Sequence, residues 1–493
     1  MKHSSKYFSL LEETLNRLLP QERVGEPTVN IFSKNRHDLM DALKSVFSGG
    51  QFTSLIVVSD GVSKKSGCDE LSIDELVAQC LALIKIPVER ISIANAAQCR
   101  PEDVHASIEV VQFLKKQIGQ MKPSPVLVVG SGSATDVVKH ALCELNWNQV
   151  PFVSLPTALT VTAFTSHFAV LEEAGAKRTR LSRRVDFCLW FAPVLASAPL
   201  EMTRAGYGDL LARFVAYGDW YLAWRFGIAD RYDELAWRLM EPFAEDLKVV
   251  APELRQWPVA NTAMERLSAI LAMAGIAMSV SGETTPLSGY EHTISHALDY
   301  LRLTGKRNLC WHGEQVALAS LASAQSFDEL LSMETISLQG RRLLSDDHVQ
   351  RMVSQLLLNA PYFGPGEAVL SAEERKAAVA NLQAGIARAG EIFSSDYLVK
   401  HRRWASVQER CAEFEEQWSE TRRHLRTLVI SSVEMRDLLE KSGLPTMPEE
   451  LSQATTAQEF RWAIRFSPFV RGRASLADII FWMGEDPAIL AAV

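Results

Sequence analysis

Five short apolar runs, each bounded by turn-forming residues, alternate with helical patterns in the first 200 residues of the chain. They are SLIVVSD (54–60), ISIA (91–94), VLVVG (126–130), FVSLP (152–156) and FCLWF (187–191). Continuous apolar runs of this length are typical of parallel strands that are buried on both faces. The helical patterns between them supply the crossover connections that parallel strands need. This part of the chain is therefore predicted to be an α/β domain.

Strand patterns become rare after Pro199, where long stretches repeat apolar residues at helical spacing instead. A chain of 493 residues is also too long for one ordinary hydrophobic core. We predict an α/β domain over residues 1–199 and an all-α domain over residues 200–493. An additional helical segment is expected near residues 330–425.

The composition excludes several classes of partner. There are 51 basic and 59 acidic residues, a formal charge of -8, which gives no general attraction to nucleic acid or anionic lipid. Seven cysteines without CxxC pairs favour reduced thiols over a disulfide framework. Neither a signal sequence nor an apolar stretch of roughly 20 residues stands out. We expect a soluble, cytoplasmic protein with a small-molecule substrate and no membrane span; whether it forms a homo-oligomer is left open.

A glycine-rich turn follows the third apolar run. Gly130, Ser131, Gly132 and Ser133 lie between VLVV and a helical pattern. A strand, a glycine turn and a helix N-terminus place backbone N–H groups where a pyrophosphate can bind. A tight turn without any ligand uses the same residues, and the spacing departs from GxGxxG. The turn by itself therefore leaves both interpretations open.

Asp60 closes the first apolar run. An acidic side chain at the end of a strand can accept hydrogen bonds from a ribose, and it would repel the additional phosphate of NADP. An Asp-Gly turn is at least as good an explanation of the same residues. The preference for NAD over NADP rests on Asp60 alone.

Histidines and one aspartate form a candidate metal site. His292 and His296 are four residues apart in a predicted helix and share a face, while His312 lies on the next element. Asp209 is expected near the start of an earlier helix. Two imidazoles and one carboxylate can bind zinc, iron or nickel and leave a position open for substrate. Histidines at helical spacing are more often structural or exposed than ligands, so the pattern alone does not assign a metal.

A series of motifs, taken in their order along the chain, resembles a known family. The motifs are GSGSATD, PTALTVTAFTS, AGYGDLLAR, SGYEHTISH, HGEQV and, near the C-terminus, GLPTMPEEL with RGRASLADI. They resemble those of glycerol-1-phosphate dehydrogenases, within the wider group of metal-containing alcohol dehydrogenases, glycerol dehydrogenases and dehydroquinate synthases. The resemblance spans about residues 50–485. It implies NAD or NADP, one divalent ion, and a helical metal domain that follows the dinucleotide-binding domain.

The resemblance also implies roles for particular residues. It makes Asp209, His292 and His312 the metal ligands and places His296 near the nicotinamide, where it is expected to move a proton. The expected substrate residues are Thr162 and Lys177, although a basic turn exposed to solvent is the other explanation of Lys177. The expected cofactor residues are Gly130, Ser131, Gly132, Ser133, Asp136, Pro156, Thr157 and Thr165, to which the position of Asp60 adds a further one. Three more matching residues, Arg471, Arg473 and Asp478, receive no chemical role.

One departure from the family concerns the substrate. Thr162 and Ala163 stand where the family has an Asp-Gly pair. The family's aspartate would hydrogen-bond polyol hydroxyls beside the metal, whereas threonine keeps a donor and an acceptor but loses the charge. The identity of the substrate therefore stays open.

The function that the resemblance implies is that of an NAD(P)-dependent, metal-containing alcohol dehydrogenase. Its reaction would be hydride transfer to a small phosphorylated ketone, dihydroxyacetone phosphate, to give glycerol 1-phosphate. Another polyol or alcohol dehydrogenase is one alternative, and a lyase like dehydroquinate synthase, which shows no net turnover of NAD, is another. An inactive homologue that acts as a binding protein is the third.

Overall fold

The computed structural model describes residues 5–19, 27–47, 52–68, 70–100, 104–173, 176–338, 343–363 and 371–490 of the chain. It divides into two compact units, neither of which is one continuous segment. The first unit comprises Met1–Glu173, Arg178–Leu210 and Leu235–Thr284. The second comprises Ala174–Lys177, Leu211–Glu234 and Thr285–Val493.

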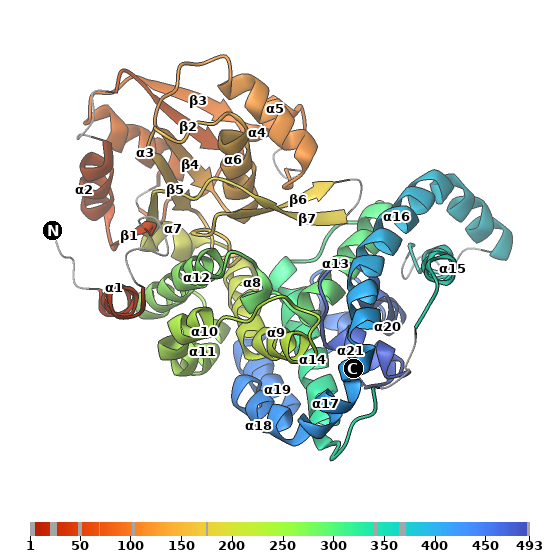
Figure 1. Cartoon of the computed structure of the whole chain (residues 1–493). Helices are drawn as coiled ribbons and strands as arrows, with labels where there is room; N and C mark the ends of the chain where they lie inside the picture. The colour runs from red at the N-terminus through yellow and green to blue at the C-terminus, as the bar shows by residue number, and fades with distance from the viewer. Residues whose placement is uncertain are drawn as a thin grey trace. The chain divides into compact units, whose positions relative to one another are not determined.

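A six-stranded sheet forms the centre of the first unit (Figure 1). Its strand order is β1-β8-β5-β4-β2-β3, and every neighbouring pair is parallel. All residues of β4 and β5 are buried, as their continuous apolar sequences predict. The strands are β1 (Val29–Ser33), β2 (Leu55–Ser59), β3 (Val88–Ser92), β4 (Val126–Gly130), β5 (Phe152–Pro156) and β8 (Phe187–Phe191).

Four of these six strands lie where the apolar runs predict them, and the other two show the limits of the pattern. The run ISIA (91–94) is a strand only in part, because β3 ends at Ser92 and Ser92 caps a helix, accepting a hydrogen bond from the N–H of Asn95. The sequence analysis does not predict β1, whose short sequence VNIFS pairs with β8 alone. Nor does it predict the separate two-stranded sheet of β6 (Phe168–Glu173) and β7 (Ala176–Leu181), since AKRTRL in β7 is mostly polar.

The helices of the first unit include those that connect and cover the strands. One of them, α6, contacts β4, β5 and β6. Its position after β4 makes it the helix that follows the glycine turn. The helices are α1 (Lys6–Leu18), α2 (Arg36–Phe47), α3 (Ile73–Ala82), α4 (Ile93–Ala97), α5 (Ile108–Ile118), α6 (Gly132–Glu144), α7 (Ala192–Ser197), α8 (Leu200–Leu211), α10 (Glu234–Met240), α11 (Ala244–Val250) and α12 (Asn261–Ser281).

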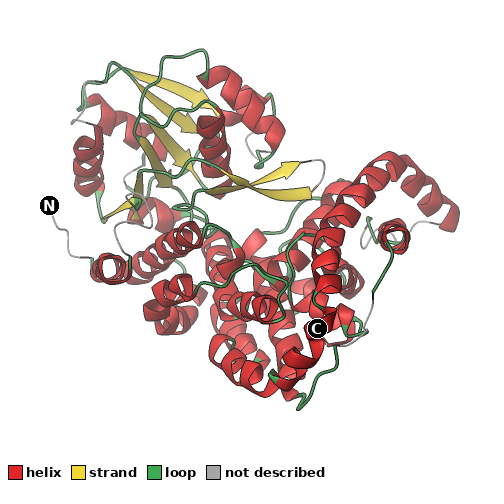
Figure 2. Cartoon of the chain, in the orientation of Figure 1, coloured by secondary structure: helices red, strands yellow, loops and turns green. Residues whose placement is uncertain are grey.

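In the second unit, helices dominate the described residues (Figure 2). Two of them, α13 and α14, pack against each other. The parallel sheet followed by a mostly helical region confirms the predicted fold class. The helices are α9 (Ala216–Arg225), α13 (Tyr290–Thr304), α14 (His312–Ser332), α15 (Asp346–Leu358), α16 (Ala372–Ser406), α17 (Cys411–Glu416), α18 (Trp418–Leu428), α19 (Ser432–Ser442), α20 (Ala457–Phe466), α21 (Leu476–Trp482) and α22 (Pro487–Leu490).

The predicted domain boundary near residue 199 follows the change in secondary structure, because β8 ends at Phe191. The compact units are divided differently. Residues Leu235–Thr284, which are helical, belong to the first unit together with the sheet. The division into domains at residue 199 therefore stays a prediction, as does the status of 330–425 as an additional segment.

One helix of the first unit, α12, is long and apolar enough by composition to cross a membrane. The sequence analysis does not anticipate it. Most of α12 is buried inside the structure, however, as the core helix of a globular protein would be. A single buried helix of this kind is weak evidence for a membrane span.

Candidate metal and cofactor site

The glycine turn joins β4 directly to α6. Ser131 is the N-cap residue of α6, with no hydrogen bond from its own side chain to the helix, and Gly132 is the first helical residue. A Cβ atom on Gly130 would lie 2.6 Å from the Cβ of Ala134, and one on Gly132 would lie 2.5 Å from Cγ2 of Val161. Close packing of strand, helix and the following loop therefore requires both glycines, whatever ligand binds there.

Asp60 lies beside this turn. It follows β2, the neighbour of β4 in the sheet, and a Cβ on Gly130 would lie 3.5 Å from its Oδ2 atom. The sheet order reverses here, because β3 lies on one side of β2 whereas β5 and β8 lie on the other side of β4. Ligands of open α/β sheets bind at such a reversal, outside the carboxyl ends of the strands. Asp60 and the glycine turn are therefore where this fold would bind a dinucleotide.

The charge of Asp60 is paired. The ammonium of Lys64 lies 2.5 Å and 2.6 Å from the two carboxylate oxygens of Asp60, and the N–H of Val62 donates to Oδ1 at 3.0 Å. A cation in this place offsets the negative charge that would repel the additional phosphate of NADP. The sequence favours NAD over NADP because of the negative charge of Asp60. Since Lys64 compensates this charge, the preference loses its basis.

The loop after β5 is tied to both the sheet and α12. Pro156 is the register partner of Gly130, and the N–H of Thr157 donates to the carbonyl of Gly130 at 3.1 Å. The hydroxyl of Thr165 donates to the carbonyl of Ala272 at 2.6 Å, so it anchors the loop. The buried hydroxyl of Thr157 has no hydrogen-bond partner within the described part of the chain. Of the two threonines, Thr157 is the one whose hydroxyl a ligand could engage.

Asp136 and Lys139 hold the segment that follows this loop. The carboxylate of Asp136 accepts from the N–H of Val170 at 3.0 Å and lies 3.2 Å from Nζ of Lys139. Lys139 is fully buried, which lowers its pKa, and it also donates to the carbonyl of Ala163 at 3.0 Å. These contacts are all made to the protein, and the predicted contact of Asp136 with the cofactor stays a prediction.

Asp209 lies near the end of α8, not near the start of a helix as the sequence predicts. Its side chain is buried, and Oδ2 accepts a hydrogen bond from the N–H of Thr162 at 2.7 Å. A Cβ on Gly206 would lie 2.2 Å from the carbonyl oxygen of Leu159, so α8 and this loop are in direct contact. The backbone of Thr162 makes this hydrogen bond, so it does not depend on the side chain at position 162. The replacement of the family's aspartate by threonine therefore leaves the bond to Asp209 intact.

Three histidines lie close together on α13 and α14. The ring centroids of His292 and His312 are 5.2 Å apart, and those of His296 and His312 are 5.8 Å apart. His292 and His296 occupy one face of α13, and His312 begins α14, as the sequence predicts. The structure therefore brings together the three predicted histidines.

Hydrogen bonds orient two of these rings. Oε1 of Glu291 lies 2.8 Å from Nδ1 of His292 and also accepts from the N–H of Gly289 at 2.6 Å. The hydroxyl of Ser295 lies 3.2 Å from Nδ1 of His312. Partners at Nδ1 leave Nε2 of each ring as the atom to ligate a metal, a common arrangement in metalloproteins. Sequence reasoning missed Glu291 and Ser295, although both lie inside the SGYEHTISH motif.

Asp209, His292 and His312 are the group that could hold a metal ion. Each offers one ligand atom, and these atoms lie within 4.8 Å of one another. One carboxylate and two oriented imidazoles fit a divalent ion such as zinc, iron or nickel. The donor set does not select among these metals.

His296 contacts an arginine. Its Nε2 lies 2.7 Å from Nη2 of Arg471, and since a guanidinium can only donate, the imidazole is neutral and carries its proton on Nδ1. Burial and then the charge of Arg471 lower the pKa of His296 well below its ordinary value. The ring is therefore uncharged at the position where the resemblance leads us to expect proton transfer. Its role near the nicotinamide stays a prediction.

Lys177 is not part of an exposed basic turn. Its ammonium lies 2.9 Å from Oδ2 of Asp299, and only 21% of its side chain is exposed. Asp299 is buried on α13, three residues after His296. This position brings the lysine to the same helix that carries two of the histidines.

Arg473 and Asp478, which match the family without an assigned role, make structural contacts. Arg473 donates to the hydroxyl of Ser288 at 2.7 Å, just before α13. The carboxylate of Asp478 lies 2.7 Å from Nζ of Lys400, and both side chains are fully buried. These residues hold the segments around α13 and α21 in place.

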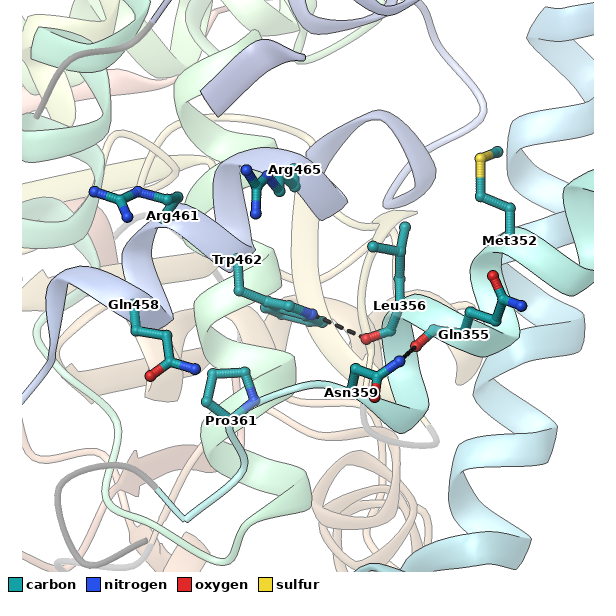
Figure 3. A pocket seen from close by; sticks show the side chains of 9 residues that line it. All are labelled: Met352, Gln355, Leu356, Asn359, Pro361, Gln458, Arg461, Trp462 and Arg465. Carbon is teal, nitrogen blue, oxygen red and sulfur yellow. Dashed lines mark hydrogen bonds between the residues drawn. The ribbon is translucent and has the colours of Figure 1, made fainter. Parts of the chain in front are cut away.

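A separate hollow lies between α15 and α20 (Figure 3). Trp462 and Leu356 line it, and the indole N–H of Trp462 donates to the carbonyl of Leu356 at 3.0 Å. The exposed Arg461 and Arg465 line it as well. None of the residues predicted as a site lines this hollow.

Comparisons with known proteins agree with this fold. Residues 38–199 match the family model of the iron-containing alcohol dehydrogenases. An alcohol dehydrogenase from Oenococcus oeni has a similar structure, with a TM-score of 0.52 and 15% identity over 93% of this chain and 98% of its own. An iron-containing alcohol dehydrogenase from Corynebacterium glutamicum has a TM-score of 0.50 and 14% identity over 96% and 99%. The chain is thus similar to the iron-containing alcohol dehydrogenases, in sequence over residues 38–199 and in fold over most of its length.

The chain is also similar in sequence to curated glycerol-1-phosphate dehydrogenases. The glycerol-1-phosphate dehydrogenase (NAD(P)+) of Metallosphaera sedula is 30% identical over 226 residues, 45% of this chain and 61% of the relative. That of Methanosarcina barkeri is 28% identical over 280 residues, 54% of this chain and 74% of the relative. The resemblance to glycerol-1-phosphate dehydrogenases that the motifs indicate is confirmed. The chain spans about three fifths of the length of the first such relatives.

Proposed function

We propose that the protein is a metal-dependent oxidoreductase that transfers hydride between NAD(P)H and a small phosphorylated ketone in the cytoplasm. Its reaction would convert dihydroxyacetone phosphate to glycerol 1-phosphate. The single observation that carries the proposal is the Asp209, His292 and His312 group, with ligand atoms within 4.8 Å of one another. The curated relatives with this activity support the choice of substrate.

The residues around the two cofactors have separate tasks in this proposal. When bound, the divalent ion would supply polarisation of the carbonyl group and NAD(P)H would supply the hydride. Glu291 and Ser295 contact Nδ1 of His292 and His312, so Nε2 of each ring would be the atom that holds the ion. The N–H of Thr162 holds one oxygen of Asp209 in place.

His296 would present a proton to the substrate without being charged itself. Because Arg471 donates to Nε2, the hydrogen of the neutral ring is on Nδ1, which is buried and has no hydrogen-bond partner among the described residues. A neutral N–H of this kind can donate a hydrogen bond to an oxygen on which charge develops. It is therefore a positioned donor rather than an imidazolium acid.

The side chain of Thr162 carries the remaining difference from the family. It offers a hydroxyl where the family has a carboxylate, so hydrogen bonds to substrate hydroxyls are weaker than charge-assisted ones would be. Another polyol or alcohol as substrate is the alternative that this feature favours. It changes the substrate and leaves the reaction type the same.

The proposal is tested by following NADH and NADPH oxidation by the full chain loaded separately with zinc, nickel or iron. Dihydroxyacetone phosphate, dihydroxyacetone and glyceraldehyde 3-phosphate are the substrates to compare. We expect metal-dependent turnover with dihydroxyacetone phosphate that His312→Ala abolishes. His348→Ala is the matched control, since His348 lies in the first turn of α15 and is exposed.

Different results would contradict different parts of the proposal. Turnover of dihydroxyacetone alone would retain the dehydrogenase and reject the phosphorylated substrate. NAD that stays bound and is not consumed during turnover would favour a lyase. A loaded protein that consumes none of these substrates and cofactors would reject the proposed reaction.

A further inference from the structure

One buried carboxylate joins the starts of two helices in the second unit. Oδ1 of Asp219 accepts a hydrogen bond from the N–H of Leu476 at 2.6 Å, and Oδ2 accepts from the N–H of Tyr290 at 2.6 Å. Tyr290 is the first residue of α13, and Leu476 is the first residue of α21. The first N–H groups of a helix have no partner within that helix. A side chain of a third helix, α9, therefore caps both.

The same two segments meet again at His296. This histidine lies in the second turn of α13, and Arg471, whose Nη2 is 2.7 Å from its Nε2, lies shortly before α21. We propose that Asp219 is a positioning residue for His296, because it holds α13 and the segment before α21 in the arrangement that brings His296 to Arg471. The inference rests on the proposed function for the use of the proton on Nδ1. The position of the ring rests on the hydrogen bonds alone.

The carboxylate of Asp219 is closely packed. Its residue is 1% exposed, and a Cβ on Gly289 would lie 2.2 Å from Oδ2 of Asp219 and 3.1 Å from Cα of Ala216. The start of α13 therefore packs directly on α9, and α9 contacts α21 as well. A side chain of another size at position 219 would have to displace one of the two capped helices.

Electrostatics ties this carboxylate to its two partners. Burial, followed by the negative charge of Glu291, raises the pKa of Asp219 above its ordinary value, whereas the two backbone N–H groups and the charge of Arg473 act in the opposite direction. A buried polar group that loses its hydrogen bond costs its full desolvation penalty. Neither helix start can therefore move away from Asp219 without leaving an N–H and a carboxylate oxygen unpaired in the interior.

Arg473 joins the same two segments at a second place. It donates to the hydroxyl of Ser288 at 2.7 Å and to that of Thr285 at 3.2 Å. Both acceptors precede α13, so these bonds hold the loop before the helix. Asp219 holds the first residue of the helix itself, from which the place of His296 follows by the helical repeat. Loss of the bonds to Asp219 should therefore displace α13 while Arg473 keeps the segments together.

The test follows the ring nitrogens of His296 by heteronuclear NMR in the metal-free full chain, isotope-labelled at histidine. The hydrogen bond at one nitrogen of a neutral imidazole decides whether the other carries the proton. The wild-type ring should therefore show a protonated Nδ1 and an unprotonated Nε2, two well-separated resonances that His296→Gln identifies by their loss. We expect Asp219→Asn to reduce this separation, because asparagine keeps one acceptor oxygen and turns an NH2 group toward the other N–H.

Asp328→Asn is the matched control for this variant. Asp328, on α14, caps another helix of the same unit, since its Oδ2 accepts from the N–H of Ser432, the first residue of α19, at 2.9 Å. The substitution changes the same chemical groups between two helices. It should leave the resonances of His296 where the wild-type chain has them.

A second pair of variants leaves Asp219 unchanged and removes one of its donors. Proline is tolerated at the first position of a helix, so Leu476→Pro removes the N–H that Oδ1 of Asp219 accepts. Leu476→Ala shortens the side chain and keeps this N–H. We expect the separation of the two resonances to shrink in Leu476→Pro and to persist in Leu476→Ala. This pair gives the answer if Asp219→Asn does not fold.

Three results would overturn the inference without any measurement of turnover. The first is an unchanged separation in both Asp219→Asn and Leu476→Pro. The second is a wild-type His296 that carries its proton on Nε2. The third is an equal change in Leu476→Ala and Leu476→Pro, which would assign the effect to side-chain packing.

Turnover of dihydroxyacetone phosphate tests the link to the proposed function separately. Asp219→Asn should lower kcat about 10- to 100-fold and leave KM unchanged, because a displaced donor on His296 is lost mainly in the transition state. Resonances that change in the variants of a chain that reduces no ketone would support the positioning role and reject the proposed reaction. An active wild-type chain whose kcat and resonances stay the same in Asp219→Asn would retain the reaction and reject the role of Asp219.

Discussion

Oε1 of Glu291 lies 2.8 Å from Nδ1 of His292, and the glutamate has no exposed surface. A buried carboxylate at this nitrogen fixes the tautomer of the imidazole and raises its basicity as a metal ligand. For His312, the partner of Nδ1 is the uncharged hydroxyl of Ser295, at 3.2 Å. The two candidate histidine ligands therefore differ in how strongly the protein orients them.

Glu291→Gln should weaken metal binding about 10- to 100-fold, because the amide keeps the shape and the hydrogen bonds but not the charge. The measurement is the metal content of the protein after equilibrium dialysis against buffered zinc and nickel. Glu329→Gln, an exposed residue of α14, controls for the loss of one negative charge. Equal metal content in both variants would show that Glu291 does not support the ligand.

Lys64→Met should reduce the use of NADPH relative to NADH. The ammonium of Lys64 pairs with the carboxylate of Asp60. Without Lys64 this carboxylate would lack its counterion at the point where the strand order of the sheet reverses. This carboxylate would repel the additional phosphate of NADP. The ratio of kcat/KM with NADPH to kcat/KM with NADH should therefore fall about tenfold, close to the effect of one ion pair. Asp60→Asn should change the ratio in the opposite direction. An unchanged ratio in both variants would place the NADP phosphate elsewhere.

Gly275→Ala should destabilise the first unit by about 1–3 kcal/mol through overpacking. A Cβ on Gly275 would lie 2.2 Å from Oγ1 of Thr165 and 2.8 Å from the backbone nitrogen of Ser166. Urea unfolding measures the change.

Gly385→Ala is the matched control for that prediction. Gly385 is also a helical glycine, in α16, and a Cβ there would meet no atom within 4 Å. Removing a glycine from an open helical position should stabilise the chain by about 0.5–1 kcal/mol. Destabilisation by both substitutions would mean that helix packing is not what requires Gly275.

His167 should make stability fall on mild acidification. Burial, followed by the charges of Lys139 and Arg184, lowers the pKa of His167 to about 4. The unfolded chain takes up this proton near its ordinary pKa of about 6.5, so acid favours the unfolded state between these two values. Stability from this residue is complete above pH 6.5 and is lost as the pH falls toward 4, by about 1–3 kcal/mol.

The measurement for His167 is the midpoint of urea unfolding at a series of pH values from neutral to about 4. His167→Gln cannot take up the proton and should therefore flatten the pH dependence in this range. A slope that is the same in the variant and in the wild-type chain would assign the acid sensitivity to other groups.

The sheet shows how far a local pattern reaches. Strands β2, β4, β5 and β8 lie where apolar runs predict them, because strands buried on both faces need continuous apolar sequence. The edge strand β1 and the polar strand β7 lack such runs, and pairing with a neighbour makes them strands.

In the candidate site, too, local patterns predict only some of the contacts. The spacing of His292 and His296 predicts that they share a helical face, and the structure agrees. No spacing predicts that Lys177 reaches Asp299, that Lys64 pairs with Asp60, or that Arg471 contacts His296. Two of these three contacts join residues more than a hundred positions apart, and all three change the charge state or availability of a predicted residue.

The sequence by itself determined the class of fold, the glycine turn and the candidate metal ligands, because periodicity and short motifs are local properties of a chain. Only the tertiary structure decided how these groups are charged and oriented. Burial and the side chains that the fold holds at contact distance set the tautomer of His292, the neutral state of His296 and the pairing of Asp60. Such effects depend on distance in space and on exclusion of water, neither of which is encoded in the order of residues nearby.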